Sequence, residues 1–387
     1  MKILQVTGSG TVGTVHAGPV SSVALNLSNE FVKMGHEVDL IDSPSHARRC
    51  KINDKVRVHE ILRKPRSRTG IVQVDRLVNG WANYLQIRRK LNWRDYHAIH
   101  VHEAHHAHVF SRMVAQPLLW TAHSLNWTMD PDRGVGPRGH IARRIELAAC
   151  RAADQVVVLN EQTREALSFN NVTVVPNGIA LEDWPVVNKA EARLALGIAQ
   201  DAFVVSYFGR IAPEKGVDIY VRAVCRLADQ VHIQADAIGS LSGQFDDRHS
   251  VSRYARQVMA MSDKIKFRGF IHRDEPEYRR RMAAADLVII PSRSEPFGLV
   301  VLEALACGAR VIGSDTGGIR DMLGSGLGRL VPPGNPLALA RSMLEEYRKP
   351  NRTQRFTDSR HLERFQWHII GERYLKVMSK LKDGTQS

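Results

Sequence analysis

Short apolar runs alternate with amphipathic stretches along the first half of the chain, a pattern that predicts strands alternating with helices. The expected strands cover residues 3–7, 37–41, 97–102, 117–121, 155–159 and 172–175. The expected helices cover residues 19–34 and 142–152, and another helix is expected to begin near residue 105. Because strands that are joined by helices run parallel, the pattern predicts a parallel sheet with helices on both faces.

The alternation lapses over residues 181–189 and then resumes, which indicates a second domain. Strands are expected at 203–208, 231–237, 264–267, 286–290 and 310–314, with helices at 217–228 and 299–306. A chain of 387 residues is long enough for two such domains. We therefore expect an α/β protein with domains 1–185 and 186–364, followed by an amphipathic segment that opens at residue 365.

The composition is typical of a folded protein in a reducing compartment. Hydrophobic residues make up 43% of the chain, and the sequence holds no apolar run of the roughly 18 residues that cross a bilayer. The first residues read as a strand and not as a signal peptide. Cysteines stand at positions 50, 150, 225 and 307, without a Cys-x-x-Cys pair, which argues against disulfides and zinc. We expect a cytoplasmic protein.

The formal net charge of +14 favours contact with anionic partners. Basic residues gather at 48–49, 64–68 and 88–90, all in the first quarter of the chain. A peripheral contact with an anionic membrane, at its inner face, or an anionic acceptor fits these clusters, and a solvated basic face is the alternative. Nucleic acid is not expected, because the sequence shows no helix-turn-helix, zinc-finger or aromatic RNA-binding pattern.

Residues 286–308 carry most of the information about function. An apolar strand ends before a polar turn, and Pro296 is expected in the first turn of a helix over 299–306 that Gly308 closes. The first backbone N–H groups of a helix have no partner inside it, so they form a site for an anion. The expected donors belong to Phe297, Gly298 and Leu299.

Two carboxylates flank this helix start, Glu295 and Glu303. Eight residues of helix span roughly 12 Å, which is too far for a glycosidase pair that acts on one bond from about 5 Å apart. The spacing suits a ligand with a hydroxyl-rich group at each end and a diphosphate between them. A nucleotide-sugar is such a ligand.

The segment from Glu295 to Glu303 resembles the E-x7-E motif of the retaining glycosyltransferases of family 4. The resemblance implies a GT-B fold, in which two doubly wound, Rossmann-like domains face each other across a cleft. It implies that the second domain binds the nucleotide-sugar, and that the first binds the acceptor and is completed by a C-terminal helix over 365–387. It also implies that Glu295 holds hydroxyls of the transferred sugar and Glu303 those of the ribose.

The segment 207–216 resembles the Gly-Arg…Glu-Lys-Gly signature of the same family. A strand ends in glycine here, and two cations, Arg210 and Lys215, precede a helix. Arginine grips phosphate oxygens with two nitrogens and lysine supplies a point charge. Together they are expected to neutralise a leaving diphosphate, so no metal or other cofactor is expected to be essential.

Six histidines lie between residues 97 and 108, which raises the alternatives of a metal site or a polar pocket wall. His100 and His102 alternate with apolar neighbours and so share one face of their strand. His102 and Glu103 lie at the carboxyl end of that strand, where doubly wound sheets bind ligands. We expect these two residues at the acceptor site, and no metal.

The segment Trp120–Ser124 resembles the family's histidine-bearing loop, which implies that His123 contacts the transferred hexose near the reacting carbon. Residues 126–140 follow it and are long enough to line an acceptor pocket. The first loop contains G-x-G-x-x-G at residues 8–13, but a dinucleotide site is disfavoured because the helix begins only near Gly18. The family's glycine pair before that helix matches here at Gly18 alone.

These residues together predict a retaining hexosyltransferase that uses a nucleotide-sugar, a UDP-sugar ahead of a GDP-sugar. The acceptor is expected to carry a hydroxyl, as in glycolipid, cell-surface polysaccharide or small-metabolite glycoside synthesis. The resemblance implies a front-face mechanism in which the leaving phosphate takes the acceptor proton. Two alternatives stay open: a sugar-nucleotide 2-epimerase of similar architecture, and a polyanion- or membrane-binding protein with a degenerate enzyme fold.

Overall fold

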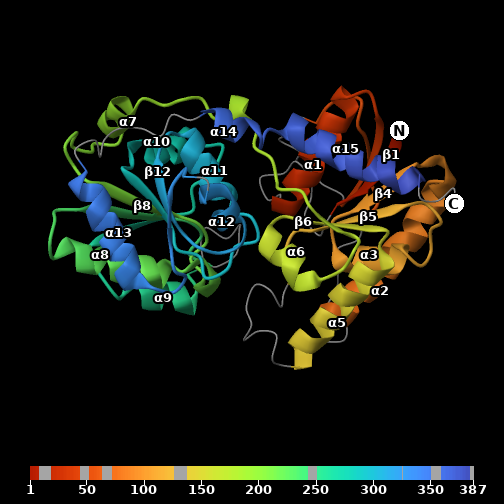
Figure 1. The fold of residues 1–387 in the computed structure, drawn as a ribbon, viewed down its shortest axis with the longest axis horizontal. Coiled ribbons are helices and arrows are strands. Elements are labelled where there is room, and N and C mark those ends of the chain that lie inside the picture. Colours follow the sequence, from red (N-terminus) through yellow and green to blue (C-terminus); the bar gives the residue numbers. More distant parts are fainter. Residues whose placement is uncertain are drawn as a thin grey trace. The chain divides into compact units, whose positions relative to one another are not determined.

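The computed structural model describes residues 1–7, 19–43, 52–62, 72–125, 137–242, 251–324, 326–349 and 359–383 (Figure 1). The chain forms two compact units: Met1–Gly178 together with Trp367–Ser387, and Ile179–Gln366. We expected the boundary between the domains near residue 185 and the return to the first domain at residue 365.

The first unit is built on a seven-stranded, wholly parallel sheet, as the alternating pattern predicted. Its five inner strands are almost entirely buried, because helices cover both faces, whereas the edge strands β3 and β7 are partly exposed. In spatial order the strands are β3 Arg57–Glu60, β2 Glu37–Asp42, β1 Lys2–Val6, β4 Ala98–Val101, β5 Leu118–Ala122, β6 Gln155–Val158 and β7 Val172–Val174.

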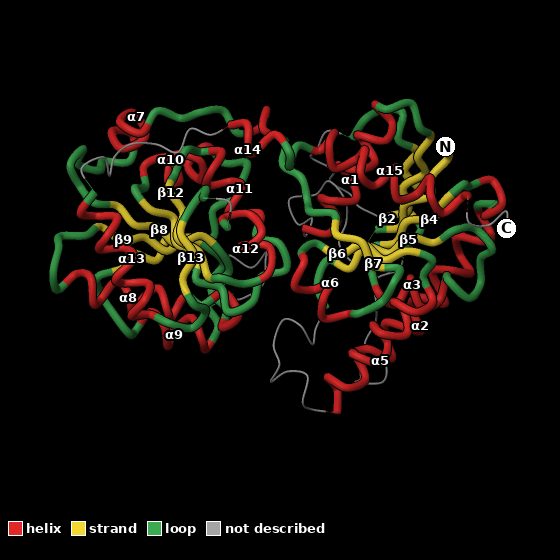
Figure 2. The backbone as a smooth tube through the Cα atoms, in the orientation of Figure 1, coloured by secondary structure: helices red, strands yellow, loops and turns green. Residues whose placement is uncertain are grey.

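Helices lie on both faces of this sheet, with α1 and α15 on one face and α2, α3 and α5 on the other (Figure 2). Helices α2, α3 and α5 bury the apolar side chains of their face of the sheet in a core that includes Trp93, Phe110 and Trp120. The helices of the first unit are α1 Pro19–Lys33, α2 Val72–Lys90, the 3-10 turn η1 Trp93–Asp95, α3 Ala104–Phe110, α5 Pro137–Ala152, α6 Glu161–Leu167 and α15 Trp367–Asp383.

The C-terminal helix α15 packs against α1 through a glycine. A Cβ at Gly371 would lie 3.2 Å from the Met34 Cε and 3.3 Å from the Glu30 Cβ, so a larger residue would push the two helices apart. On the sheet side, the buried Tyr374 hydroxyl lies 3.1 Å from the Thr121 hydroxyl of β5. These contacts tie the end of the chain to the unit that contains its beginning.

The second unit holds a six-stranded parallel sheet in the order β10-β9-β8-β11-β12-β13, with helices on both faces. Its strands are β8 Val204–Phe208, β9 Gln234–Ile238, β10 Ile265–Gly269, β11 Leu287–Ile290, β12 Arg310–Ser314 and β13 Arg329–Val331. Its helices are η2 Leu181–Asp183, α7 Lys189–Ala195, η3 Pro213–Lys215, α8 Val217–Ala228, α9 Arg253–Met259, α10 Pro276–Ala284, α11 Leu299–Ala306, α12 Gly317–Leu323, α13 Pro336–Arg348 and α14 Ser359–Glu363.

A buried ion pair joins α7 to the central strands of the second unit. The Arg193 guanidinium donates to Asp286 at 2.8 Å, and each side chain is only 2% exposed. Arg193 also donates to the carbonyl oxygens of Ala284 and Gln200, and the Val204 N–H donates to Asp286 at 2.8 Å. The full set of partners compensates for the loss of water around both charges.

Two sequence predictions differ from the structure in position, and a third is confirmed. The strand expected at 231–237 is β9 at Gln234–Ile238, because the Val231 N–H still bonds to the Leu227 carbonyl in the turn after α8. The helix expected from residue 142 begins at Pro137, so the end of the 126–140 segment is helical. The helix expected near residue 105 is confirmed as α3.

Candidate functional site

The loop between β11 and α11 is shaped by glycines. Gly298, the residue before α11, has a left-handed φ of 91°, and a Cβ there would lie 3.2 Å from the Glu295 Cγ. The helix therefore begins at Leu299, and the expectation that Pro296 lies in its first turn is wrong. Gly308, with a φ of 75°, follows the helix end as expected.

The fold brings together two predicted site residues from different loops, Lys215 and Glu295. The Lys215 ammonium lies 2.6 Å from the Glu295 carboxylate, and the two side chains are 19% and 11% exposed. The Ser292 hydroxyl donates to the same Glu295 oxygen at 3.2 Å. Lys215 comes from the 3-10 turn η3, eighty positions earlier in the chain. A cation and an acceptor therefore lie side by side at the start of α11.

Arg293, in the loop between β11 and α11, holds this loop against the turn that carries Lys215. Its guanidinium donates to both carboxylate oxygens of Asp218, at 2.8 and 2.7 Å, and to the Pro213 carbonyl at 2.6 Å. Its backbone N–H donates to the Glu214 carbonyl at 2.9 Å. Arg293 thus holds the turn that carries Lys215 through the backbone of the turn and through the Asp218 side chain that follows it.

Gly216 also allows the turn that carries Lys215 to lie close to the end of β11. It ends η3 with a left-handed φ of 67°, and a Cβ there would lie 2.0 Å from the Pro291 carbonyl oxygen. Real Cβ atoms do not approach an oxygen that closely. The Glu-Lys-Gly sequence therefore ends in glycine because the turn lies directly against the end of β11.

Arg210, the other predicted phosphate contact, follows β8 in the same loop. Its guanidinium pairs with Glu214 at 2.8 Å, and its carbonyl accepts a hydrogen bond from the Tyr207 hydroxyl at 2.7 Å. Burial raises the pKa of Tyr207 well above its ordinary value, and the nearby Glu295 charge adds to the effect. Tyr207 therefore stays a neutral donor that orients the Arg210 backbone.

Glu303, predicted to hold ribose hydroxyls, is buried on α11. It accepts a hydrogen bond from the Tyr278 hydroxyl at 3.0 Å and pairs with Arg273 at 3.3 Å. Burial, with the Glu303 charge second, raises the pKa of Tyr278 well above its ordinary value. The premise of eight helical residues between Glu295 and Glu303 is wrong, because Glu295 precedes the helix.

In the first unit, three polar side chains form a hydrogen-bonded chain across adjacent strands. His102, which follows β4, lies 2.9 Å from Gln5 of β1 through its Nε2 and 2.9 Å from the His123 Nε2 through its Nδ1. Burial lowers the pKa of His123 to about 4 and that of His102 well below its ordinary value, so both are neutral at pH 7.

The orientation of the Gln5 side-chain amide determines which atom donates in each of these hydrogen bonds. The Gln5 side-chain NH₂ faces the Ala24 carbonyl and the Ser28 hydroxyl, and that hydroxyl already donates to the same carbonyl. The amide oxygen therefore faces His102 and accepts from its Nε2–H. His102 Nδ1 must then accept from the Nε2–H of His123. This leaves His123 Nδ1 with a free lone pair in the neutral ring.

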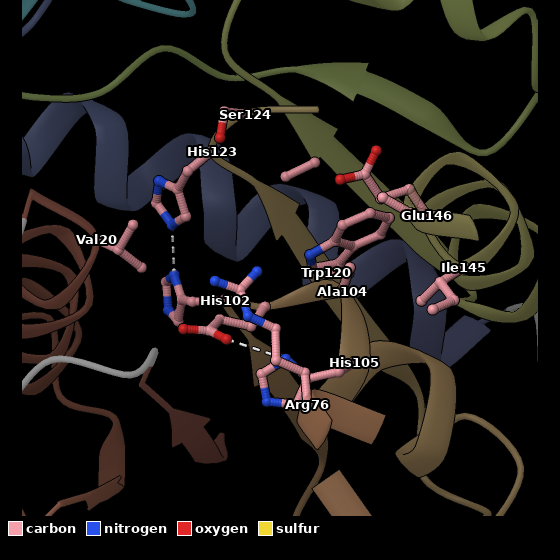
Figure 3. A pocket seen from close by; sticks show the side chains of 13 residues that line it. Val20, Arg76, His102, Ala104, His105, Trp120, His123, Ser124, Ile145 and Glu146 are labelled. Atoms are coloured by element: carbon pink, nitrogen blue, oxygen red, sulfur yellow. Dashed lines mark hydrogen bonds and ion pairs between the residues drawn. The ribbon is translucent and has the colours of Figure 1, made fainter. Parts of the chain in front are cut away.

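These histidines line a cavity of about 310 Å³ in the first unit (Figure 3). His102 and His123 lie on one side, and Trp120 and Glu146 lie across from them. Among the residues that the structure describes, none forms a hydrogen bond with the buried indole N–H of Trp120. The lining residues are Val20, Arg76, His102, Glu103, Ala104, His105, Trp120, Ala122, His123, Ser124, Ala142, Ile145 and Glu146.

The structure thus places the two predicted acceptor residues, His102 and Glu103, in one cavity with His123. Glu103 pairs with His105 at 3.0 Å, and this pair forms part of the wall. Sequence reasoning missed Gln5 and Trp120 as site residues. Their signals were a polar residue inside an apolar strand, and a tryptophan immediately before the histidine loop.

The neighbouring histidines form a buried layer beneath this cavity. The ring centroids of His100 and His102 are 4.2 Å apart, which confirms that they share one face of β4. Burial lowers the pKa of His100 and His106 to about 3. In the parts of the chain that the structure describes, no three His, Cys, Asp or Glu side chains are arranged to hold a metal ion.

Some predicted features lie outside the described residues. They are the G-x-G-x-x-G loop with Gly18, the basic clusters at 48–49 and 64–68, Cys50 and the 126–136 segment. No helix in the described ranges combines the length and the apolar character needed to cross a bilayer.

Comparison with known protein families covers both units. Residues 20–183 match the family model described as Glycosyltransferase Family 4, and residues 188–360 match that of Glycosyl transferases group 1. The chain belongs to glycosyltransferase family 4. A D-inositol 3-phosphate glycosyltransferase of Thermobispora bispora is 30% identical over 68% of this chain and 65% of its own length. The chain spans about half to two thirds of the length of the first curated relatives that it matches.

Solved structures extend the comparison to the fold of this family 4 chain. A sucrose-phosphate synthase from Thermosynechococcus elongatus superposes with a TM-score of 0.80 at 23% identity, covering 99% of this chain and 100% of that one. The Anabaena protein HepE in complex with UDP-glucose superposes with a TM-score of 0.68 at 20% identity, covering 98% and 100%. The GT-B assignment is confirmed, with its two parallel-sheet units.

Proposed function

We propose that this family 4 protein is a retaining hexosyltransferase, which moves a sugar from a nucleotide-sugar to a hydroxyl group. The observation that carries the proposal is the Lys215–Glu295 pair at the glycine-capped start of α11. A leaving diphosphate needs positive charge and free N–H donors, and a hexose needs hydroxyl acceptors. Both kinds of group lie together in that loop.

The donor roles follow from the chemistry of each side chain. Lys215, Arg210 and the N–H groups at Phe297, Gly298 and Leu299 stabilise the charge that builds on the diphosphate as the glycosidic bond breaks. Glu295 holds hydroxyls of the hexose. With two side-chain cations in these roles, no metal is required for the leaving group, and we propose that none is essential.

Glu303 and its buried partner Tyr278 hold the ribose hydroxyls in this proposal, and a UDP-sugar is the favoured donor. Support for the nucleotide comes from HepE, which shares the fold and was crystallised with UDP-glucose. Gly18, which lies outside the described residues, is assigned to the donor by family resemblance alone.

The acceptor is assigned to the cavity of the first unit. Glu103, Glu146 and the His123 Nδ1 offer acceptors to its hydroxyls, and Arg76 offers donors to its oxygens. Such a mixed lining favours a polyhydroxylated ring that carries an oxyanion. The relatives named D-inositol 3-phosphate glycosyltransferase support a cyclitol phosphate as the first compound to try.

Two measurements test the proposal. The melting temperature is recorded with UDP-, GDP- and ADP-sugars, and a specific donor raises it by mass action. The stabilising donor is then incubated with inositol phosphate and other hydroxyl acceptors, and the anomeric configuration of the product is read by NMR. Transfer with retention supports the proposal. Isomerised sugar-nucleotide from donor alone would assign the protein to the epimerases instead, and inversion would remove the retaining mechanism.

A further inference from the structure

Helix α2 exposes the side chains that a helix ordinarily buries. Val78, Trp81 and Leu85 are 51%, 44% and 47% exposed. Their spacing of three and four residues places them on one face of the helix, and we call them the apolar stripe. Single exposed apolar residues are normal on a protein surface, but a row of three large ones along one helix marks an interaction surface.

The buried side of α2 carries a row of polar residues of the kind that an ordinary surface helix exposes. Asp75, Asn79 and Asn83 are 6%, 8% and 1% exposed, and they follow one another at intervals of four residues. Asn83 hydrogen bonds to the ring of His106 on α3 at 3.2 Å. The inward face is thus committed to the polar layer of histidines, which leaves the apolar stripe to the surface.

The packing of α2 fixes this orientation. A Cβ at Gly80 would lie 3.1 Å from the His105 carbonyl oxygen and 3.3 Å from the Val109 side chain, so the glycine lets α2 approach α3 closely. Tyr84 and Ile87 add an apolar seam to the same core. A rotation that buried the apolar stripe would break all of these contacts.

The helix ends in three consecutive cations, Arg88, Arg89 and Lys90, which we call the basic end. All three are exposed, and no carboxylate in the described ranges forms an ion pair with them. An apolar face that includes a tryptophan, next to a basic segment, is the pattern of a helix that lies in the interface of an anionic membrane.

We propose that α2 is a docking surface for an anionic lipid membrane, with the apolar stripe among the headgroups and the basic end against the lipid phosphates. The charge of the chain favours a membrane over a second copy, because two copies would each bring a net charge of +14 to the contact. Arg76 of the same helix lines the cavity of the first unit, so a docked helix would hold that cavity close to the bilayer surface.

Vesicle binding by the full chain tests this proposal. We expect strong co-sedimentation with vesicles of phosphatidylcholine and phosphatidylglycerol, little with phosphatidylcholine alone, and a decline as salt rises. Arg88→Gln, Arg89→Gln and Lys90→Gln together should weaken binding roughly a hundredfold, at about fivefold per cation. Val78→Ser, Trp81→Ser and Leu85→Ser together should weaken it more than about tenfold.

A matched control uses apolar residues that are exposed elsewhere. Val186 and Leu194 of the second unit are 78% and 79% exposed, and replacing both with serine should leave vesicle binding unchanged. Melting temperatures of all variants verify folding. Absence of binding to the anionic vesicles, or binding that survives loss of the apolar stripe, overturns the proposal. So does a dimer in solution that only the apolar stripe variant abolishes, because the stripe would then bind a second copy.

Discussion

Replacement of Lys215 by alanine separates the proposed leaving-group role from a structural one. The Lys215 ammonium lies 2.6 Å from Glu295, and the turn that carries it is fastened by Arg293 and closed by Gly216. Alanine removes the charge but keeps the backbone contacts that position the turn. The donor-binding loops should therefore keep their shape, while the diphosphate loses one of its two side-chain cations.

The expected changes in kcat, donor Kd and stability differ, because the Lys215 charge acts differently in the transition state, the donor complex and the fold. Removing one preorganised group that stabilises developing charge lowers kcat by about a hundredfold to a thousandfold, or about 3–4 kcal/mol. The ground-state diphosphate is already charged but still partly solvated, so donor Kd should rise by less than about tenfold. The folded protein should lose about 1–3 kcal/mol, less than for a fully buried pair, because both Lys215 and Glu295 retain some contact with water.

The assay compares kcat, donor Kd and melting temperature in the same preparations. Lys189 provides a matched control in the same unit, since it pairs with Asp286 at 2.5 Å and its side chain is 15% exposed. Lys189→Ala should lower the melting temperature but leave kcat within about twofold of the wild type, because its partner joins α7 to the sheet and lies in no proposed donor contact. Lys215→Arg should recover part of the lost turnover.

Equal losses in kcat and donor affinity for Lys215→Ala would refute the reasoning, because they would show that the lysine binds the diphosphate without favouring the transition state. The same holds if Lys189→Ala reduces kcat as strongly as Lys215→Ala at matched stability. The effect would then report general weakening of the unit.

Three further predictions concern stability and the histidine chain. Gln5→Leu should remove the acceptor of the His102 N–H and lower the free energy of unfolding by about 1–3 kcal/mol. In the wild type, ¹⁵N NMR should show His123 protonated at Nε2. An Nδ1–H form of His123 would contradict the direction assigned to the hydrogen bond between His123 and His102. Asp286→Asn should destabilise the second unit by about 3–5 kcal/mol by leaving Arg193 buried and unpaired, whereas urea melts unchanged within error would show the pair to be dispensable. Because burial lowers the pKa of His123 from 6.5 to about 4, this residue should contribute a loss of roughly 3 kcal/mol of stability as pH falls from 6.5 to 4. The buried His100, His102 and His106 also have lowered pKa values and add to the loss, so His123→Gln should make that part of the stability curve less steep without flattening it.

The elements that the sequence predicted best are those bounded by clear breaks. Helix α8 and strand β12 have the bounds expected, because Gly216 directly precedes the helix, and the apolar pair Val311 and Ile312 of the strand lies between polar residues at its two ends. Strand β3 was missed, since it lies at the sheet edge and its residues are polar or half exposed. A period-2 or continuous apolar pattern is absent from such a strand.

The candidate site was predictable one loop at a time. The E-x7-E and Glu-Lys-Gly segments identified Glu295 and Lys215 separately, and the structure brings them into contact. The role of Arg293 could not be read in the same way, because it depends on which loop lies beside it: its partners Pro213 and Asp218 are eighty and seventy-five positions away. No spacing rule reports such a contact.

Helix α2 shows why one part of the chain resisted pattern reasoning. Periodicity assigns apolar residues to the interior, but here Asn79 and Asn83 face the core and Trp81 and Leu85 face outward. Asn83 hydrogen bonds to His106 of α3, so this arrangement is consistent with the packing around it. A local rule that is broken where the packing is otherwise satisfied points to a surface under functional selection. The proposed membrane contact accounts for that break, since a bilayer supplies outside the protein the apolar environment that the core does not.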